Sequence, residues 1–578
     1  MTFCFTPARD DAILCDRTLP VNSNVYQALP RVSDSSPDTD WRLPLARWLA
    51  PALLGIVAFT LVLAITDPPS PGIDPDALAY VGSAESFALH GEFRIPTSHW
   101  PSRDSTSALT HFPPGYSTAM ALPVRAGMAP VQSARLVQAT AAFVTVTTLA
   151  FLVGEATAPL AGILLATALF GISAMYEVHL SVLSEPLFLA LLALTLAAMV
   201  RREDRPWLAG LFAALAAMTR YAGISAIGAV ALWSVARKGT LAERLRRGVW
   251  AILPAAVLQG LWFVRTKLVA TTESIRELAL YGDLGPTIRQ GATTLASWLV
   301  PDADGALDPA DAMPHRGLIA VVTAALLVVI VLAGTLRTLR QYRVERADGG
   351  TATADSNAGT ALRLLAASAL LIVCYLALLI VSRLIADPGI PFDERILAPV
   401  IMLGMTIAAT GIALWWRSTR TELPKIALCG ALLGWWFAAA SVMWTEASYV
   451  MAWGSDFAAD QWHRSELLEW ARTRGQGHSL YSNWPVVPYF YLGRPARDVP
   501  RLNESTQLAE FADSVRAHDG LVLAFNVPGI EYVTVDSLAK TPGFQMIARV
   551  QDGAVFAPAP AGATPARPPT VALPSPRR

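Results

Sequence analysis

The sequence predicts an α-helical integral membrane protein with about eleven spanning helices and a small C-terminal α/β domain outside the membrane. Of its 578 residues, 53% are apolar and 16% are charged, and the mean hydropathy is +0.41. Apolar runs long enough to approach a hydrocarbon core of about 30 Å recur along the chain. Clusters of arginine flank these runs and indicate which ends face the cytoplasm.

Nine apolar runs are the most evident spans, and a tenth stretch at 207–233 is basic at both ends. Because basic flanks favour the cytoplasmic side, we interpret 207–233 as a hairpin of two short spans with its outer turn at 219–221. The total is then eleven spans. The nine runs lie at 49–66, 136–153, 160–176, 183–200, 250–264, 318–336, 364–381, 396–416 and 426–444.

The same arginine clusters predict a cytoplasmic N-terminus and an outer C-terminus. Because the first apolar run has no small-residue cleavage signal after it, we expect an anchor and not a removable signal peptide. The expected organisation is a polar cytoplasmic segment at 1–48, a transmembrane domain at 49–444 with outer loops at 67–133 and 265–316, an outer α/β domain at 445–556, and a disordered Pro/Ala-rich tail at 557–578.

The outer domain is predicted from alternating helical and strand patterns after the last span. The patterns indicate an amphipathic helix at 456–474, a strand at 479–483, a helix at 506–518, a buried strand at 521–525, and a hairpin at 544–556 that turns at Asp552 and Gly553.

Charge and motif content exclude several classes of function. The 45 basic residues equal the 45 acidic ones, so the chain has no net positive field to bind nucleic acid. The sequence contains no phosphate-loop, Rossmann or HExxH motif, which argues against ATP-driven pumping and zinc proteolysis. Neither a disulfide framework nor a CxxC metal site is expected from the four cysteines, Cys4, Cys15, Cys374 and Cys429.

Two carboxylates follow the exit of the first span. Asp74 and Asp76 lie shortly before Tyr80, in a segment that begins at Gly72. A carboxylate at the outer surface can take a proton from a hydroxyl group and act as a general base. A structural role is equally open, because Asp76 stands at the N-cap position of a helix predicted over 77–90.

Three arginines, Arg220, Arg265 and Arg395, lie at predicted outer ends of spans. Their planar guanidinium groups suit a phosphate ligand, but arginines at span ends also anchor helices in the headgroup layer. Glu185 lies just inside the membrane boundary, where it either serves a substrate or caps the helix that begins at Pro186. His111 either contacts substrate or braces its loop.

Four short motifs are Asp76 with Tyr80, Phe112-Pro113-Pro114-Gly115-Tyr116, Leu183-Ser184-Glu185-Pro186-Leu187, and Asp393-Glu394-Arg395 followed by Pro399. Together they resemble the bacterial branch of the lipid-sugar-dependent membrane glycosyltransferases with the GT-C fold. This group includes protein O-mannosyltransferases, the aminoarabinose transferase of lipid A and related lipopolysaccharide sugar transferases. One departure concerns Pro75, which separates Asp74 from Asp76 where relatives often have an adjacent Asp-Glu pair.

The resemblance implies inverting transfer of a sugar from a polyprenyl phosphate to an envelope lipid, glycan or protein. It places the reaction at the outer face of a bacterial cytoplasmic (inner) membrane, among membrane lipids. It implies no nucleotide and no obligatory metal, although paired carboxylates are able to hold a divalent ion. The implied roles are a base at Asp76 or Asp74, donor-phosphate binding by Arg395, Arg220, Arg265 and Tyr80, and substrate positioning by Glu185 and His111.

Two other functions share this membrane setting. A flippase or transporter of lipid-linked saccharides would also have many spans, but it commonly shows internal repeats and ionisable groups near the midplane. Here the acidic groups concentrate in outer loops, and no repeat is evident. An O-antigen-type polymerase or ligase would lack both the early outer-loop aspartate and the α/β tail.

Overall fold

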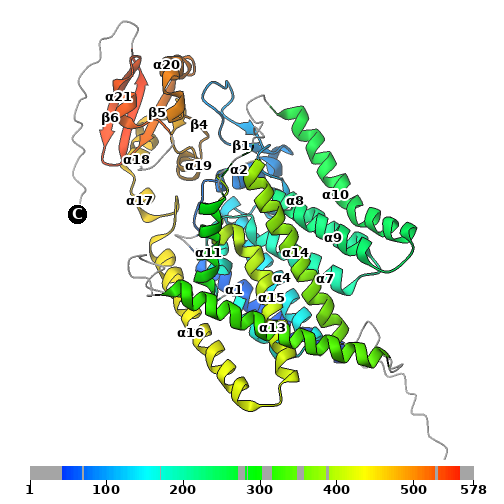
Figure 1. Ribbon diagram of the computed structural model, residues 1–578. Coiled ribbons are helices and arrows are strands. Elements are labelled where there is room, and N and C mark those ends of the chain that lie inside the picture. Colours follow the sequence, from blue (N-terminus) through cyan, green and yellow to red (C-terminus); the bar gives the residue numbers. More distant parts are fainter. Residues whose placement is uncertain are drawn as a thin grey trace, which may run out of the picture. The chain divides into compact units, whose positions relative to one another are not determined.

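The structure is a computed structural model (Figure 1), and the chain divides into two compact units, Met1–Leu45 and Ala46–Arg578. Apart from the first turn of α1, every element described below belongs to the second unit. Cys4 and Cys15 lie outside the described residues. The structure describes residues 42–67, 71–169, 171–270, 280, 282, 284–302, 315–347, 357–385, 389–526 and 532–559.

The predicted membrane protein is confirmed, because seven of the described helices are long and apolar enough to cross a membrane. Shorter apolar helices fall on the remaining predicted spans, and the number of crossings, predicted as eleven, stays a prediction. The seven long helices are α1 (Arg42–Ile65), α4 (Pro130–Ala156), α10 (Leu241–Val269), α13 (Arg316–Ala347), α14 (Asn357–Ile385), α15 (Glu394–Ser418) and α16 (Glu422–Trp453). The shorter ones are α5 (Pro159–Leu169), α7 (Glu185–Arg201), α8 (Pro206–Thr219) and α9 (Ile224–Ala236).

The run predicted as one span at 160–176 is wrong in its extent. α5 ends at Leu169, and α6 (Ser173–Leu180) forms a separate helix. The break follows from a tight turn in which the Gly171 N–H bonds to the carbonyl of Ala168, three residues back. By contrast, the predicted hairpin over 207–233 is present, because α8 ends at an extended Arg220 and α9 begins four residues later, at Ile224.

The loop at 67–133, which is predicted to lie outside the membrane and is called the first outer loop below, carries α2 (Ala77–His90), a two-stranded sheet of β1 (Arg94–Ile95) and β2 (Ser107–Ala108), and α3 (Gly115–Arg125). α2 occupies the predicted helix at 77–90 and ends at Gly91, whose φ of 74° is the left-handed conformation that glycine adopts without strain. The second outer loop carries α11 (Gly285–Leu299).

The C-terminal α/β domain, which is predicted to lie outside the membrane and is called the outer α/β domain below, contains a five-stranded sheet in the order β4-β3-β5-β7-β6, in which β3 is parallel to β4 and β5. The predicted strands and C-terminal hairpin are present, as β3 (Ser479–Ser482), β5 (Gly520–Phe525), β6 (Phe544–Val550) and β7 (Gly553–Pro558). β7 continues past the predicted end of the domain at 556, and the rest of the Pro/Ala-rich tail lies outside the described residues. The helices are α17 (Asp460–His463), α18 (Glu466–Arg474), α19 (Val486–Leu492), α20 (Leu508–Ala517) and α21 (Val535–Lys540), and β4 spans Ala496–Asp498.

The helices and strands from α16 onward differ from the sequence prediction in three ways. The helix predicted at 456–474 is split, because the Ser465 hydroxyl accepts a hydrogen bond from the Leu468 N–H at 3.1 Å and starts α18 anew. α16 also continues to Trp453, so the last long helix extends past the predicted boundary at 444. β4, α19 and α21 were not predicted, because each is too short to show a periodic pattern.

The outer α/β domain shares a hydrophobic core with the first outer loop. Ile73, Ala77 and Tyr80 belong to the same buried cluster as Val487 and Leu523 of the sheet region. The hydroxyl of Tyr489 on α19 also donates to Glu85 of α2 at 2.5 Å. α2 is therefore fixed on one side by the outer domain.

Close approach of α8 to α10 generates a stability prediction. A Cβ added at Gly210 would overlap the carbonyl of Ala251, whereas one added at Gly260 of α10 would meet nothing within 4 Å. We expect Gly210→Ala to destabilise the protein by about 1–3 kcal/mol through overpacking. Gly260→Ala, with its better helix propensity, is expected to leave the thermal midpoint unchanged or raised. Thermal unfolding in detergent would measure both, and equal midpoints would contradict the packing argument.

Candidate active site

The start of α15 places Arg395 among three carboxylates. Its Nη2 donates to Asp76 Oδ2 at 2.6 Å, its Nε donates to Glu185, and its Nη1 lies 3.5 Å from Asp74 Oδ2. Arg220 reaches the same Glu185 oxygen, with its Nη1 at 2.5 Å. These five residues, Asp74, Asp76, Glu185, Arg220 and Arg395, are called the carboxylate–arginine cluster below.

A short extended segment brings the members of the cluster together. Gly72 exchanges backbone hydrogen bonds of 2.8 Å with Leu180 and Val182, just before Glu185. The next residue, Ile73, accepts a 3.1 Å bond from the N–H of Phe457. Because Asp74 and Asp76 follow directly, the backbone contacts at Gly72 and Ile73 fix both carboxylates beside the head of α7.

Asp76 occupies the N-cap position of α2, but its side chain makes no capping hydrogen bond. Instead, the Asp76 N–H donates to Asp74 Oδ1 at 2.9 Å, while the Asp76 carboxylate pairs with Arg395. The capping role considered for the Asp76 side chain is therefore wrong. Its carboxylate belongs to the cluster.

Glu185 is the buried centre of the cluster, with a side chain only 2% exposed. A buried carboxylate is costly unless cations and hydrogen bonds compensate for lost hydration. Two guanidinium groups supply that compensation here. The neighbouring Ser184 hydroxyl accepts from Arg220 at 3.1 Å and donates to the Tyr80 hydroxyl at 3.2 Å, which joins Tyr80 to the cluster.

Aromatic rings close one side of the cluster. The Tyr80 ring lies 4.9 Å from that of Phe112 and 5.3 Å from that of Tyr116, measured between centroids. Both tyrosines are buried, and burial raises the pKa of the Tyr80 phenol above its usual value. Tyr80 is therefore a neutral hydrogen-bonding group.

Arg265 does not join the cluster. Its guanidinium donates to the carbonyls of Leu109 and Phe93 and lies 4.7 Å from the Trp262 ring centroid. The prediction that groups it with the donor-binding arginines is not supported by these contacts, which brace the β1–β2 loop. His111 also lies outside the cluster and packs edge-on against Phe112, with ring centroids 4.9 Å apart.

Asp74 has an unusual environment for a carboxylate. Burial and the adjacent Asp76 raise its pKa from 3.8 to about 6, against the opposing effect of Arg395. Asp456, at the start of the outer domain, adds a further negative charge nearby. Asp456 was not predicted as a neighbour of the cluster, because nothing in its own segment indicates that its backbone pairs with Ile73.

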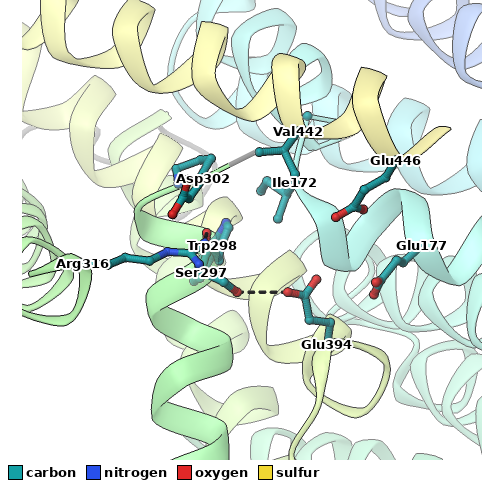
Figure 2. Close-up of a pocket in the computed structure, with 11 residues that line it drawn as sticks. Ile172, Glu177, Ser297, Trp298, Asp302, Arg316, Glu394, Val442 and Glu446 are labelled. Atoms are coloured by element: carbon teal, nitrogen blue, oxygen red, sulfur yellow. Dashed lines mark hydrogen bonds between the residues drawn. The ribbon is translucent and has the colours of Figure 1, made fainter. Parts of the chain in front are cut away.

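A cavity of about 200 Å³ borders Glu394, the residue that precedes Arg395. Figure 2 shows that residues from α6, α11, α15 and α16 project into it, and that Ser297 donates to Glu394, at 3.0 Å. Within the described part of the chain, no three His, Cys, Asp or Glu side chains are arranged to hold a metal ion. The polar lining consists of Glu177, Ser297, Trp298, Asp302, Arg316, Glu394 and Glu446.

Comparisons with known proteins find distant structural similarity over most of the chain. No protein-family model and no curated protein sequence matches it. ArnT from Cupriavidus metallidurans in the apo state is 13% identical, with a TM-score of 0.43, over 89% of this chain and 98% of that one. A structure of the same ArnT bound to undecaprenyl phosphate gives a TM-score of 0.44 at 13% identity, over 89% of this chain and 99% of that one.

The arabinofuranosyltransferase AftD from Mycobacteria is 17% identical, with a TM-score of 0.49, over 89% of this chain but only 42% of its own length. ArnT and AftD have the GT-C fold, the fold of the group that the sequence motifs resemble. Identities and TM-scores this low carry no argument about function. The function proposed below therefore rests on the geometry of the carboxylate–arginine cluster.

The raised pKa of Asp74 predicts a pH-dependent stability. Because the folded value of about 6 exceeds the ordinary 3.8, the folded state takes up this proton first as the pH falls. Ionised Asp74 therefore destabilises the protein above pH 6, by about 3 kcal/mol, and most of this penalty is lost towards pH 4. As the pH is lowered from 7 to 5, we expect the thermal midpoint of wild type to rise relative to that of Asp74→Asn.

A matched control for this prediction is Asp104→Asn, whose side chain is 75% exposed. Its thermal midpoint should follow that of wild type across the same pH range. If the Asp74→Asn and wild-type curves also ran parallel, Asp74 would have no raised pKa in the folded protein.

Proposed function

We propose that this chain is a membrane glycosyltransferase of the GT-C type, which moves one sugar from a polyprenyl phosphate to an envelope acceptor. The observation that carries the proposal is the contact of Arg395 with Asp76 at 2.6 Å. It holds a candidate base and a candidate phosphate-binding cation as one hydrogen-bonded unit, in a segment that the topology predicts at the outer face. Inverting transfer requires both groups beside the anomeric carbon.

In the proposed reaction, the acceptor hydroxyl oxygen attacks the anomeric carbon while Asp76 takes the hydroxyl proton. The bond between the anomeric carbon and the phosphate oxygen breaks, and polyprenyl phosphate leaves with the electron pair. Attack from the face opposite the leaving group inverts the configuration. No covalent enzyme intermediate is formed.

Asp76 suits the role of base better than Asp74 does. Asp76 Oδ2 bonds to Arg395, and no described residue hydrogen-bonds to its Oδ1, which leaves that oxygen for an acceptor hydroxyl. Asp74 Oδ1 already accepts the Asp76 N–H at 2.9 Å. We therefore assign Asp74 the task of orienting Asp76.

The arginines suit the departing phosphate. Arg395 Nη1 has only a 3.5 Å contact with Asp74 among the described residues, so its N–H groups are available to phosphate oxygens. Arg220, held by Glu185 and Ser184, adds a second positive charge. In this proposal the two guanidinium groups donate hydrogen bonds to the phosphate oxygens, and the donor carries no nucleotide and requires no obligatory metal ion.

The proposed location is the outer face of a bacterial cytoplasmic membrane, with the N-terminus in the cytoplasm. A polyprenyl phosphate stays in the bilayer, so the reaction belongs at the ends of helices where the cluster lies. A flippase, the main alternative, would need cationic groups for the phosphate but no base paired with them.

The first test compares wild type with Asp76→Asn in lipid nanodiscs supplied with polyprenyl-phosphate sugars and an envelope extract. Asparagine keeps the shape of the side chain but cannot take the proton. We expect release of free polyprenyl phosphate to fall by about 10²- to 10⁴-fold. Asp104→Asn, at an exposed site, should retain wild-type release.

Each alternative has its own outcome in this assay. Equal release by wild type and Asp76→Asn would remove Asp76 as the base, and loss in Asp74→Asn alone would assign Asp74. No release from any donor, with lipid movement across the bilayer intact, would favour the flippase.

A further inference from the structure

Two side chains of α11 form hydrogen bonds with the backbone N–H and the backbone carbonyl of Phe392, three residues before Arg395. The Gln290 side-chain oxygen accepts a hydrogen bond from the Phe392 N–H at 3.0 Å. The Thr294 hydroxyl donates to the Phe392 carbonyl at 2.9 Å. The segment that leads into α15 is thus tied to α11 by two hydrogen bonds to one residue.

Two further contacts bring α11 against the same segment. Ser297 donates to Glu394 at 3.0 Å, as Figure 2 shows. A Cβ added at Gly291 would lie 3.1 Å from the Phe392 ring, so only glycine allows so close an approach without displacement of the ring. Contacts with Phe392 and Glu394 therefore come from successive turns of one helix.

α11 is itself anchored to the long helices. Arg383, near the end of α14, donates to the Thr287 hydroxyl at 3.1 Å. Arg316, at the start of α13, donates to the carbonyl of Val300 at 2.9 Å. A helix attached at both ends can transmit a fixed position to the segment it holds.

We infer that Gln290 and Thr294 are positioning residues, which set the start of α15 so that Arg395 meets Asp76, Glu185 and the donor phosphate together. Asp393 completes this arrangement by accepting the Ile396 N–H at 2.8 Å, which caps α15 immediately around Arg395. Hydrogen bonding by a guanidinium depends strongly on geometry, so a small shift of its backbone weakens several contacts at once. The phosphate-binding part of this inference rests on the proposed function.

Neighbouring threonines offer a matched test. Thr294→Val removes the hydroxyl that holds Phe392, whereas Thr294→Ser keeps a hydroxyl. Thr293→Val is the control, because among the described residues the exposed Thr293 hydroxyl bonds only to carbonyls of its own helix. Gln290→Leu removes the second contact, and Gln290→Glu keeps an oxygen that accepts the Phe392 N–H.

The readouts are the dissociation constant for undecaprenyl phosphate by native mass spectrometry, hydrogen exchange over 389–397, and KM against kcat for the donor. We expect Thr294→Val and Gln290→Leu to bind the lipid phosphate about tenfold more weakly and to exchange the Phe392 amide faster. KM should rise more than kcat falls. Thr294→Ser, Gln290→Glu and Thr293→Val should remain close to wild type.

Wild-type lipid affinity in both Thr294→Val and Gln290→Leu, with faster exchange at Phe392, would overturn the inference. So would an equal loss of affinity in Thr293→Val. The binding and exchange measurements need no turnover. If wild type transfers no sugar, the proposed function fails while the role of α11 is still decided by lipid-phosphate affinity.

Discussion

The buried carboxylate of Glu185 is the interaction on which the rest of the site depends. With a side chain 2% exposed, it requires the charges of Arg220 and Arg395, and they in turn require it. Because Arg220 follows the last residue of α8 and Arg395 lies in the first turn of α15, this one carboxylate links the starts of α7 and α15 with the C-terminal end of α8. The ends of α7, α8 and α15 are thereby fixed at the level of the first outer loop.

Arg395 also interacts with the two aspartates of the first outer loop. Arg395 has more N–H groups than Glu185 accepts, and its Nη2 donates to Asp76, while its Nη1 lies 3.5 Å from Asp74. The two aspartates are brought there by backbone contacts at Gly72 and Ile73, and α2 is packed by apolar side chains shared with the outer domain. Charge fixes the helix ends, and apolar packing fixes the loop that faces them.

Much of the site was predictable from residue type and position. Asp76, Glu185, Arg220 and Arg395 are charged residues near span ends, where an unpaired charge is costly, and the structure pairs all four. The partners themselves were not predictable, because Asp76 and Arg395 are 319 residues apart. Arg265 shows the limit of the pattern: an arginine that braces carbonyls and one that faces a carboxylate look alike in sequence. The contacts of α11 with the Phe392 backbone leave no sequence signature.

The sequence separation of these contacts bears on how the protein matures. During synthesis, a chain that stops before Arg395 lacks the guanidinium that joins Asp76 to Glu185. A chain that stops before Tyr489 lacks the hydroxyl that bonds Glu85 of α2, a contact that spans 404 residues. The carboxylate–arginine cluster is therefore complete only after Arg395 has been synthesised, and α2 gains its contact with α19 only after Tyr489 has followed. A chain whose synthesis has not yet reached Arg395 has Glu185 and Arg220 but not Arg395, so its buried carboxylate has one cation in place of two.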